Sequence, residues 1–334
     1  MEKRTTKLSE VTLRITKGTT PTTEGAKFTS SGINYIKSEC ISYDGRINKE
    51  AFTFISEQTH EKLKRSQLQE GDILFSMAGV FLGKNAIVTS DILPANTNQA
   101  LAIIRVDSNK IFVKYLHYYL RMNSVIEHVN NISGQSAQPN INMEEIGSIE
   151  IPLPPLPEQE AIAEVLSSLD DKIDLLHRNN KTLEQLAETL FRQWFVEEAD
   201  DSWEEKSLDE IAEYLNGLAL QKYPAVIGEE TLPVIKIREM NQGITEATDI
   251  CSAKIPEQYI VRNGDILFSW SGSLDVILWS GCDGALNQHL FKVSSTDYPK
   301  WLIYFGTKLF LPEFRSIAHD KATTMGHIQR KHLT

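Results

Sequence analysis

The sequence of 334 residues has few cysteines, no long apolar run and no excess of positive charge. Its three cysteines, Cys40, Cys251 and Cys282, are odd in number and lack metal-ligand spacing, which indicates free thiols in a reducing cytoplasm. No stretch approaches the roughly 18 apolar residues of a membrane span, and the N-terminus leads into no apolar signal segment. We therefore expect a cytoplasmic protein without a membrane role.

Negative charge dominates the total, because 34 Lys and Arg face 45 Asp and Glu, a net charge of −11. Such a total argues against a nucleic-acid binder, whose surface is usually basic. The excess of acidic residues is confined to one segment of the chain, however. Residues 1–155 hold 17 basic and 16 acidic residues, residues 156–205 hold 4 and 14, and residues 206–334 hold 13 and 15. The nearly neutral outer segments leave room for a locally basic face on each, so nucleic acid is not excluded as a partner.

The common motifs of catalysis are also missing. The sequence has no Walker A motif, no Gly-x-Gly-x-x-Gly after a strand, no His-Glu-x-x-His and no Gly-x-Ser-x-Gly. Asp72 and Asp265 each follow a glycine at the start of a strand, where a turn role is expected rather than acid catalysis. The sequence therefore predicts a protein that is not an enzyme and that holds no metal.

An internal repeat is present. Gly71–Ser76 returns unchanged as Gly264–Ser269. Weaker matches keep the same order: they pair Leu8–Val11 with Leu208–Ile211, Tyr35–Lys37 with Val234–Lys236, Asn98–Leu101 with Asn287–Leu290, and Lys114–Tyr119 with Lys300–Phe305. One six-residue match arises by chance, but several in one order indicate two copies of one domain.

Each copy has the pattern of a mixed α/β domain. The expected strands are 73–75, 100–106, 266–268 and 290–293, and the expected amphipathic helices are 110–122 and 298–309. The predicted fold class is α/β (α+β), with two similar mixed domains joined by a long heptad-patterned helix. The predicted boundaries are 1–155, 156–200 and 201–334.

The segment between the copies differs from both. Ile151–Pro157 is rich in proline and is predicted to be extended throughout. A helix is expected from Glu158 to about Glu197, because the following apolar positions alternate spacings of four and three over about five heptads. The predicted packing seam consists of Ile162, Leu166, Leu169, Ile173, Leu176, Asn180, Leu183, Leu190 and Trp194. Asn180 falls at an a position, where a buried amide fixes the register. The alternative is a long core helix of a globular domain, in which strict heptads rarely run so far.

This central segment carries a family resemblance. The sequences at Ile151–Gln159, Ala161–Ala163, Leu169–Ile173, Asn180–Leu183 and Leu190–Phe195 resemble the central conserved region of the specificity (S) subunits of type I restriction-modification systems. The flanking copies resemble the target recognition domains of that family, so the resemblance spans essentially the whole chain. It implies that each domain reads one half of a split double-stranded DNA target, with the helix as spacer.

The resemblance also implies partners. Methyltransferase (M) subunits would dock on the helix and bring S-adenosylmethionine, and a restriction (R) subunit would add ATP- and Mg-dependent translocation and cleavage, while this chain holds no cofactor. A helix of about 40 residues is about 60 Å long, and it caps the separation of the half-sites at about 18 base pairs.

One departure from the family pattern concerns the seam. The pattern continues beyond Thr334 with a second proline-rich segment and a second conserved helix, which points to a truncated chain, a naturally shortened product or one part of a split subunit. We expect the chain to self-associate through the seam at 162–194 or to be poorly soluble. Two alternatives are a coiled-coil protein-interaction scaffold and a truncated regulatory S-like chain without a DNA function of its own.

Base-reading residues are expected in loops that differ between the copies, with Arg and Lys suited to guanine and Asn and Gln to adenine. The candidates in the first domain are Thr19, Lys27, Lys37, Lys84, Asn98, Gln99, Gln135, Gln138 and Asn140. Those in the second are Lys222, Tyr223, Lys236, Arg238, Ser271, Asn287, His289, Thr324 and His327. Asn98 and Asn287 recur in both copies, which favours turn capping as their alternative role.

Overall fold

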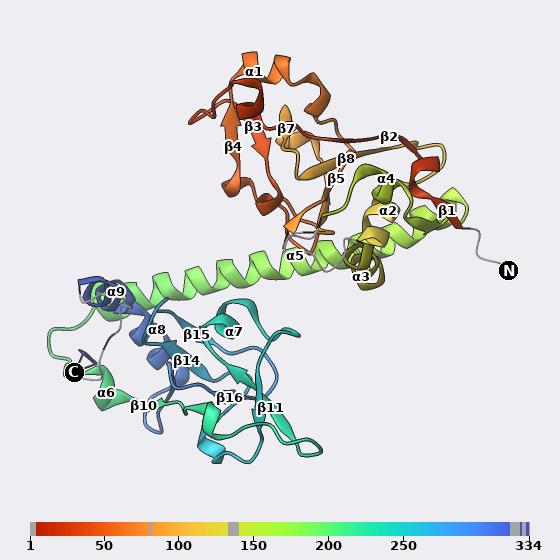
Figure 1. The fold of residues 1–334 in the computed structure, drawn as a ribbon. Coiled ribbons are helices and arrows are strands. Elements are labelled where there is room, and N and C mark those ends of the chain that lie inside the picture. The colour runs from red at the N-terminus through yellow and green to blue at the C-terminus, as the bar shows by residue number, and fades with distance from the viewer. Residues whose placement is uncertain (1–4, 80–81, 133–139, 321–327, 329–331, 334) are drawn as a thin grey trace. The chain divides into compact units, whose positions relative to one another are not determined.

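The computed structural model describes residues 5–79, 82–132, 140–320, 328 and 332–333. The chain divides into two compact units, unit 1 (Met1–Asn179) and unit 2 (Asn180–Thr334). The dividing point falls within the long helix α5, Leu156–Arg192, so each unit contains part of this helix. Both units are mixed assemblies of sheets and helices, which confirms the expected fold class (Figure 1).

Unit 1 contains a four-stranded antiparallel sheet in the order β2-β8-β5-β6, a three-stranded sheet in the order β4-β3-β7, and the pair β1-β9. Within the three-stranded sheet, β3 and β7 are parallel. The strands are β1 (Thr5–Lys7), β2 (Thr12–Lys17), β3 (Ile33–Ile36), β4 (Thr53–Ile55), β5 (Ile73–Ser76), β6 (Asn85–Ile87), β7 (Ala95–Thr97), β8 (Leu101–Val106) and β9 (Glu150–Pro152). The helices are α1 (Glu57–Lys62), α2 (Val113–Leu120), α3 (Asn123–Ile132), α4 (Met143–Gly147) and the first part of α5. In Figure 1, α1 lies at one end of the unit, and α2, α3 and α4 lie at the other.

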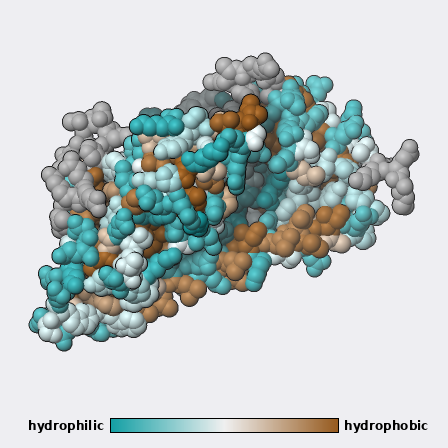
Figure 2. Space-filling model, turned by 90° about the horizontal axis from the view of Figure 1, so that it is seen from below, coloured by the Kyte–Doolittle hydropathy of each residue, from teal (hydrophilic) through white to brown (hydrophobic). Residues whose placement is uncertain are grey.

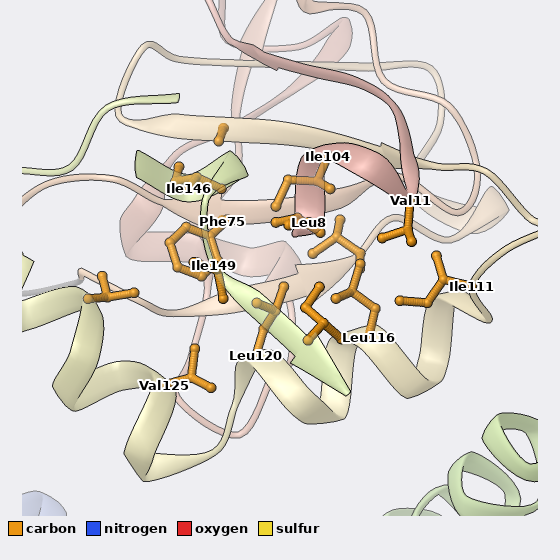
Figure 3. Close-up of a cluster of buried hydrophobic side chains, with 14 of the residues drawn as sticks. Leu8, Val11, Phe75, Ile104, Ile111, Leu116, Leu120, Val125, Ile146 and Ile149 are labelled. Carbon is orange, nitrogen blue, oxygen red and sulfur yellow. The ribbon is translucent and has the colours of Figure 1, made fainter. Parts of the chain in front are cut away.

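Strand β5 explains why one apolar run recurs in the sequence. Ile73 and Phe75 point into a core that also contains Leu116 and Leu120 of α2 (Figure 3), whereas Leu74 points into a second core on the opposite face. All four residues of β5 are buried. A strand that is covered on both faces needs a continuous apolar sequence rather than an alternating one.

Unit 2 repeats this plan. Its four-stranded sheets have the orders β10-β17-β14-β15 and β12-β11-β16-β13. The strands are β10 (Glu213–Asn216), β11 (Thr231–Ile235), β12 (Ile250–Ser252), β13 (Ile260–Val261), β14 (Ile266–Ser269), β15 (Val276–Leu278), β16 (Gly284–Leu286) and β17 (Leu290–Ser294). The helices are α6 (Leu208–Ile211), α7 (Ile237–Gln242), α8 (Lys300–Leu309) and α9 (Leu311–Asp320).

The pairing of the strands confirms the internal repeat. Strand β14 lies between β17 and β15 as β5 lies between β8 and β6, and the parallel pair β11-β16 corresponds to β3-β7. The predicted turn role of the two aspartates is also confirmed, because Asp72 accepts a hydrogen bond from the Gln69 amide and Asp265 accepts one from the Arg262 amide, each at 2.8 Å. Asp72 in addition receives two hydrogen bonds from Arg105, at 2.7 and 2.8 Å.

The proline-rich segment before α5 was expected to be extended up to Pro157, and its last two residues are helical instead. Pro152 is paired with Thr5 in the β1-β9 ladder, and α5 begins at Leu156. Proline is tolerated in the first turn of a helix, because the amide hydrogen that it lacks would have no partner within the helix. Beyond α5, a π-helical turn covers Gln193–Glu197. Within the described residues, no helix is long and apolar enough to cross a membrane.

Candidate nucleic-acid interface

In unit 2, two predicted DNA-binding residues lie together because they follow neighbouring parallel strands. Lys236 follows β11 and Asn287 follows β16, and the Asn287 amide donates a hydrogen bond of 3.2 Å to the Ile235 carbonyl. The carboxyl ends of parallel strands share one edge of a sheet. Both residues line a cavity of about 710 Å³, together with Gln221.

The chain approaches this edge closely at Gly217. A Cβ atom on Gly217 would lie 2.2 Å from the Asn287 carbonyl oxygen, so only glycine fits here. Gly18 of unit 1 has the same function, since its Cβ would lie 2.2 Å from the Thr97 carbonyl oxygen. The two units therefore bring the same loops together in the same way.

Ser271 and His289 form a second group in unit 2. The Ser271 hydroxyl lies 3.3 Å from Nδ1 of His289, and the His289 ring lies 5.7 Å from the ring of Trp270. Asn287 also caps this turn, because its side-chain oxygen accepts a bond of 3.4 Å from the His289 amide. Trp270, which was not among the predicted site residues, donates a hydrogen bond of 3.0 Å to the Asn216 side chain. Trp270 could have been recognised in the sequence as an aromatic residue that directly follows the repeated segment Gly264–Ser269.

The two basic candidates of this turn are not unpaired cations. Lys236 forms an ion pair with Asp249, and its hydrogen bond lowers the pKa of that carboxyl group. Arg238 is bound to Glu239, with Nε donating at 2.8 Å, and its Nη2 donates to the Ala247 carbonyl at 2.7 Å. Glu239 is only 1% exposed. Neither carboxylate was among the predicted site residues, although Lys236-x-x-Glu239 has the spacing at which a side chain returns to the start of a helix.

The remaining unit 2 candidates are less closely tied to this edge. Lys222 ends a 3-10 turn at Leu220–Lys222 and is exposed. Tyr223 is partly buried against a small core, and its carbonyl accepts a bond of 3.0 Å from the Ser252 amide. Thr324 and His327 lie outside the described residues.

Unit 1 gathers its candidates at the equivalent edge. Lys37 follows β3, and Asn98 follows β7, with Ile36 and Thr97 paired in parallel. The Thr19 amide donates to the Thr97 carbonyl at 3.0 Å. Lys37 lies over the ring of Phe28 at 5.2 Å and forms a 3.6 Å ion pair with Glu39.

The loop after β5 lies beside this group. The Met77 amide donates at 2.8 Å to the Ala100 carbonyl, next to the exposed Gln99. Asn140 pairs with Ala78 of the same loop. Lys84, at the far end of the loop, lies over the Tyr43 ring at 4.4 Å, and burial lowers its pKa. Lys27 is exposed, whereas Gln135 and Gln138 lie outside the described residues.

The N-terminal end of helix α5 is bound to the rest of unit 1 by polar side chains. Gln159 is completely buried and accepts a bond of 2.8 Å from the Phe112 amide. Asp170 accepts from the Tyr118 hydroxyl at 2.9 Å and pairs with Arg121 at 3.1 Å. Gln159 is therefore the residue through which the Pro-Glu-Gln sequence fixes the start of the helix.

In unit 2, the opposite end of α5 packs on α8. The ring of Phe191 lies 5.7 Å from that of Phe305 and 6.5 Å from that of Trp301. Glu184 accepts hydrogen bonds from Lys308 and the Tyr304 hydroxyl, which lower the pKa of its carboxyl group. An aromatic cluster and a charged pair thus hold this end of the helix.

The predicted seam of α5 is largely uncovered. The exposed fractions of its large apolar residues are 38% for Ile162, 55% for Leu169, 45% for Ile173, 47% for Leu176, 62% for Leu183 and 53% for Trp194. Leu166 and Leu190 are half-buried, and Asn180 is exposed. Figure 2 shows a band of hydrophobic side chains where the first half of α5 lies. In unit 1, an apolar groove of about 880 Å³ continues this surface and is lined by residues that include Tyr115, Tyr119, Met122, Ile162 and Leu166.

Within the part of the chain that the structure describes, no three His, Cys, Asp or Glu residues are grouped to hold a metal ion. The chemistry of the site consists of hydrogen-bond donors and acceptors on two equivalent loop clusters. Such groups can contact phosphates and base edges.

Comparison with known proteins identifies the family. A family model described as type I restriction modification DNA specificity domain matches residues 2–185. The MjaIX specificity subunit of Methanocaldococcus jannaschii is 24% identical over 277 residues, which is 76% of this chain and 63% of that protein. The EcoKI specificity subunit of Escherichia coli K12 is 30% identical over 213 residues, or 56% of this chain and 44% of that protein. The chain therefore spans less than two thirds of the length of these relatives.

A solved structure supports the fold. The S subunit of a type I restriction-modification system from M. genitalium has a TM-score of 0.53 and 14% identity, and the match covers 97% of this chain and 83% of that one. The curated relatives named here are specificity subunits of type I restriction enzymes. With a family model that matches more than half of its length, the chain belongs to the type I restriction modification DNA specificity domain family.

Proposed function

We propose that the chain recognises a double-stranded DNA target in two parts and directs methyltransferase and restriction subunits to it, without catalysing a reaction itself. The observation that carries this proposal is the equivalence of the two loop clusters. Lys37 and Asn98 in unit 1, and Lys236 and Asn287 in unit 2, occupy the same edge of the same parallel strand pair. Two copies of one reading surface suit a target of two half-sites.

Paired cations on both surfaces support sequence reading more than general affinity for DNA. Lys37, Lys236 and Arg238 each have a carboxylate partner, which a phosphate would have to displace. Non-specific binding depends on the release of counterions by unpaired positive charge. We therefore expect weak binding by the chain alone and tighter binding once partner subunits add contacts.

The exposed seam of α5 supports docking of other subunits. Apolar side chains in an exposed row on one helix are typical of a surface that packs against another helix. We expect methyltransferase subunits, with S-adenosylmethionine, to cover part of it. A restriction subunit would supply ATP- and Mg-dependent cleavage, and the complex would work in the cytoplasm. A second copy of this chain is the competing occupant.

The direct test is methylation by a reconstituted complex. The chain would be co-expressed with a type I methyltransferase subunit, and methylated positions in genomic DNA would be mapped. The expected result is one bipartite motif, in which Lys236→Ala with Asn287→Ala alters only one half. A complex that forms but methylates and binds DNA without sequence preference would contradict the proposal and favour a protein-interaction scaffold.

A further inference from the structure

We propose that Arg238 reads a guanine in the half-site contacted by unit 2, and that the buried Glu239 is the positioning residue that fixes its guanidinium group. This inference rests on the function proposed above. It adds the identity of one base, guanine, and the role of Glu239, which acts by orienting Arg238.

The guanidinium group of Arg238 is held at two points. Its Nε donates to Oε1 of Glu239 at 2.8 Å, and its Nη2 donates to the Ala247 carbonyl at 2.7 Å. Bonds to Nε and Nη2 fix both the position and the plane of the group. The side chain is nevertheless 47% exposed, so it is held rigidly without being buried.

Glu239 is itself fixed by several donors. Besides Arg238, it accepts from the Lys236 amide at 3.2 Å and from the Thr248 hydroxyl at 3.3 Å. A carboxylate that is 1% exposed needs such partners, because an unpaired buried charge is costly. Arg238 is therefore oriented by a side chain that cannot easily move.

The comparison with unit 1 shows that the turn does not need this charge. Cys40 takes the place of Glu239 there: its sulfur accepts from the Lys37 amide at 3.5 Å and donates to the Ala51 carbonyl at 3.3 Å. Glu39 takes the place of Arg238. Since a neutral thiol completes the same turn, the buried ion pair of unit 2 has a role beyond closing the turn.

Guanine is the base that best matches the hydrogen-bond donors of Arg238 that are not used within the protein. Within the described residues, the bonds of Arg238 use Nε and Nη2 and leave the two hydrogens of Nη1. The major-groove edge of guanine presents two neighbouring acceptors, N7 and O6, which can share one Nη1 hydrogen, whereas adenine presents an amino donor beside its N7. A rigid guanidinium loses little freedom when it binds and tolerates little displacement, which favours base reading over contact with a phosphate. The neighbouring cavity, lined by Lys236 and Asn287, places further donors beside it.

The experiment uses the full chain in complex with a methyltransferase subunit and a DNA library randomised in the half-site of unit 2. Methylation rates are compared base by base for the wild type, Arg238→Lys, Arg238→Met and Glu239→Gln. We expect the wild type to prefer guanine at one position, and both Arg238 variants to lose that preference by roughly tenfold at that position alone. Glu239→Gln should relax the same position by a smaller factor.

Arg262→Met is the matched control. Arg262 is also a half-exposed arginine of unit 2 paired with a glutamate, Glu257, and it does not belong to the turn. Its substitution should leave all base preferences unchanged. Thermal unfolding of each complex separates a change in reading from a failure to fold, and Arg238→Lys keeps the charge.

Three results would overturn the inference. Equal loss of methylation for all bases would make Arg238 a phosphate contact, and unchanged preferences in both Arg238 variants would make it a structural link to Ala247. A wild-type complex that shows a bipartite target with no guanine affected by Arg238 would refute the base assignment and leave the proposed function intact. A wild-type complex without any preferred target would instead refute the proposed function.

Discussion

The two units share a framework and differ at the surfaces that would contact other molecules. Phe75 of β5 and Phe268 of β14 occupy equivalent positions in the two units, and both side chains are completely buried. By contrast, the turn after the first parallel strand carries Cys40 in unit 1 and Glu239 in unit 2. The framework tolerates little change because its core is covered on both faces of the strand. The turn can vary because either a thiol or a carboxylate can accept the same amide hydrogen.

The attachment of α5 also differs between the units. Unit 1 holds the start of the helix through polar groups, with Gln159 buried against the Phe112 amide. Unit 2 holds its end through rings that surround Phe191, among them Phe305 and Trp301 of α8. The same helix is therefore fixed by buried and charged polar groups in unit 1, and by an aromatic cluster together with the Glu184–Lys308 pair in unit 2.

The largest effect is expected from removing a shared core residue in one unit only. Phe268→Ala should destabilise unit 2 by about 3–5 kcal/mol, because the ring is fully buried and lies 5.7 Å from that of Phe314. Hydrogen exchange resolved by peptide should show the loss in unit 2 and leave unit 1 protected. Phe75→Ala should give the reverse pattern, and Leu13→Ala, at an exposed site, should change neither. Equal loss in both units would show that they do not unfold separately.

The next effect concerns His117 of unit 1, a buried histidine whose position in unit 2 is taken by an isoleucine. Burial, with a smaller contribution from Arg121, lowers the pKa of His117 to about 4, and its Nδ1 lies 2.8 Å from the Asn85 side-chain oxygen. The repeat places Ile303 at this position in unit 2. Between pH 6.5 and pH 4 the unfolded chain binds the proton that the folded chain refuses. The free energy of unfolding should therefore fall as the pH falls through this range, by up to about 3 kcal/mol.

Urea unfolding at several pH values tests this expectation. Since carboxylates also titrate in acid, the informative quantity is the difference between the wild type and His117→Gln. That difference should change between pH 6.5 and pH 4 and be constant outside this range. A difference that is independent of pH would contradict the assignment.

The sequence predicted the framework better than the site for a physical reason. The run Ile73-Leu74-Phe75 is apolar because the strand is covered on both faces, and this requirement is local and leaves a readable pattern. Lys236 and Asn287 were candidates because they lie in loops beside repeat-equivalent strands, and the parallel pairing of those strands brings the two residues together. Glu239 was not found, since its role depends on the loop that carries Thr248 and Ala247, which folds back over the turn. A contact made by tertiary folding leaves no period in the sequence.

A smaller effect is expected from the charged pair of unit 2. Lys308 pairs with Glu184, which is 44% exposed, so the pair is partly screened by solvent. The repeat places Met122 at the position of Lys308 in unit 1, and Lys308→Met should destabilise unit 2 by about 0.5–1 kcal/mol. The hydrogen bond from Lys308 lowers the pKa of Glu184, so the stabilisation is present above the unfolded pKa and is lost as the pH falls through the folded one. The destabilisation by Lys308→Met should be larger at pH 7 than in acid, and Lys254→Met, at a more exposed pair, should destabilise the protein less at pH 7.

Substitutions in the exposed seam of α5 should have the smallest effect on stability, but they should measurably change the association of the chain. Leu169→Gln in unit 1 and Leu183→Gln in unit 2 replace residues that are 55% and 62% exposed with another good helix former, so each should change the unfolding free energy by less than about 0.5 kcal/mol. If the seam mediates self-association, light scattering over a concentration series should show a lower mass for both variants than for the wild type. Leu278→Gln, at an exposed apolar residue outside α5, is the control and should leave the mass unchanged. A monomeric wild type at every concentration would refute self-association, and an effect of only one substitution would assign the contact to the part of α5 in that unit.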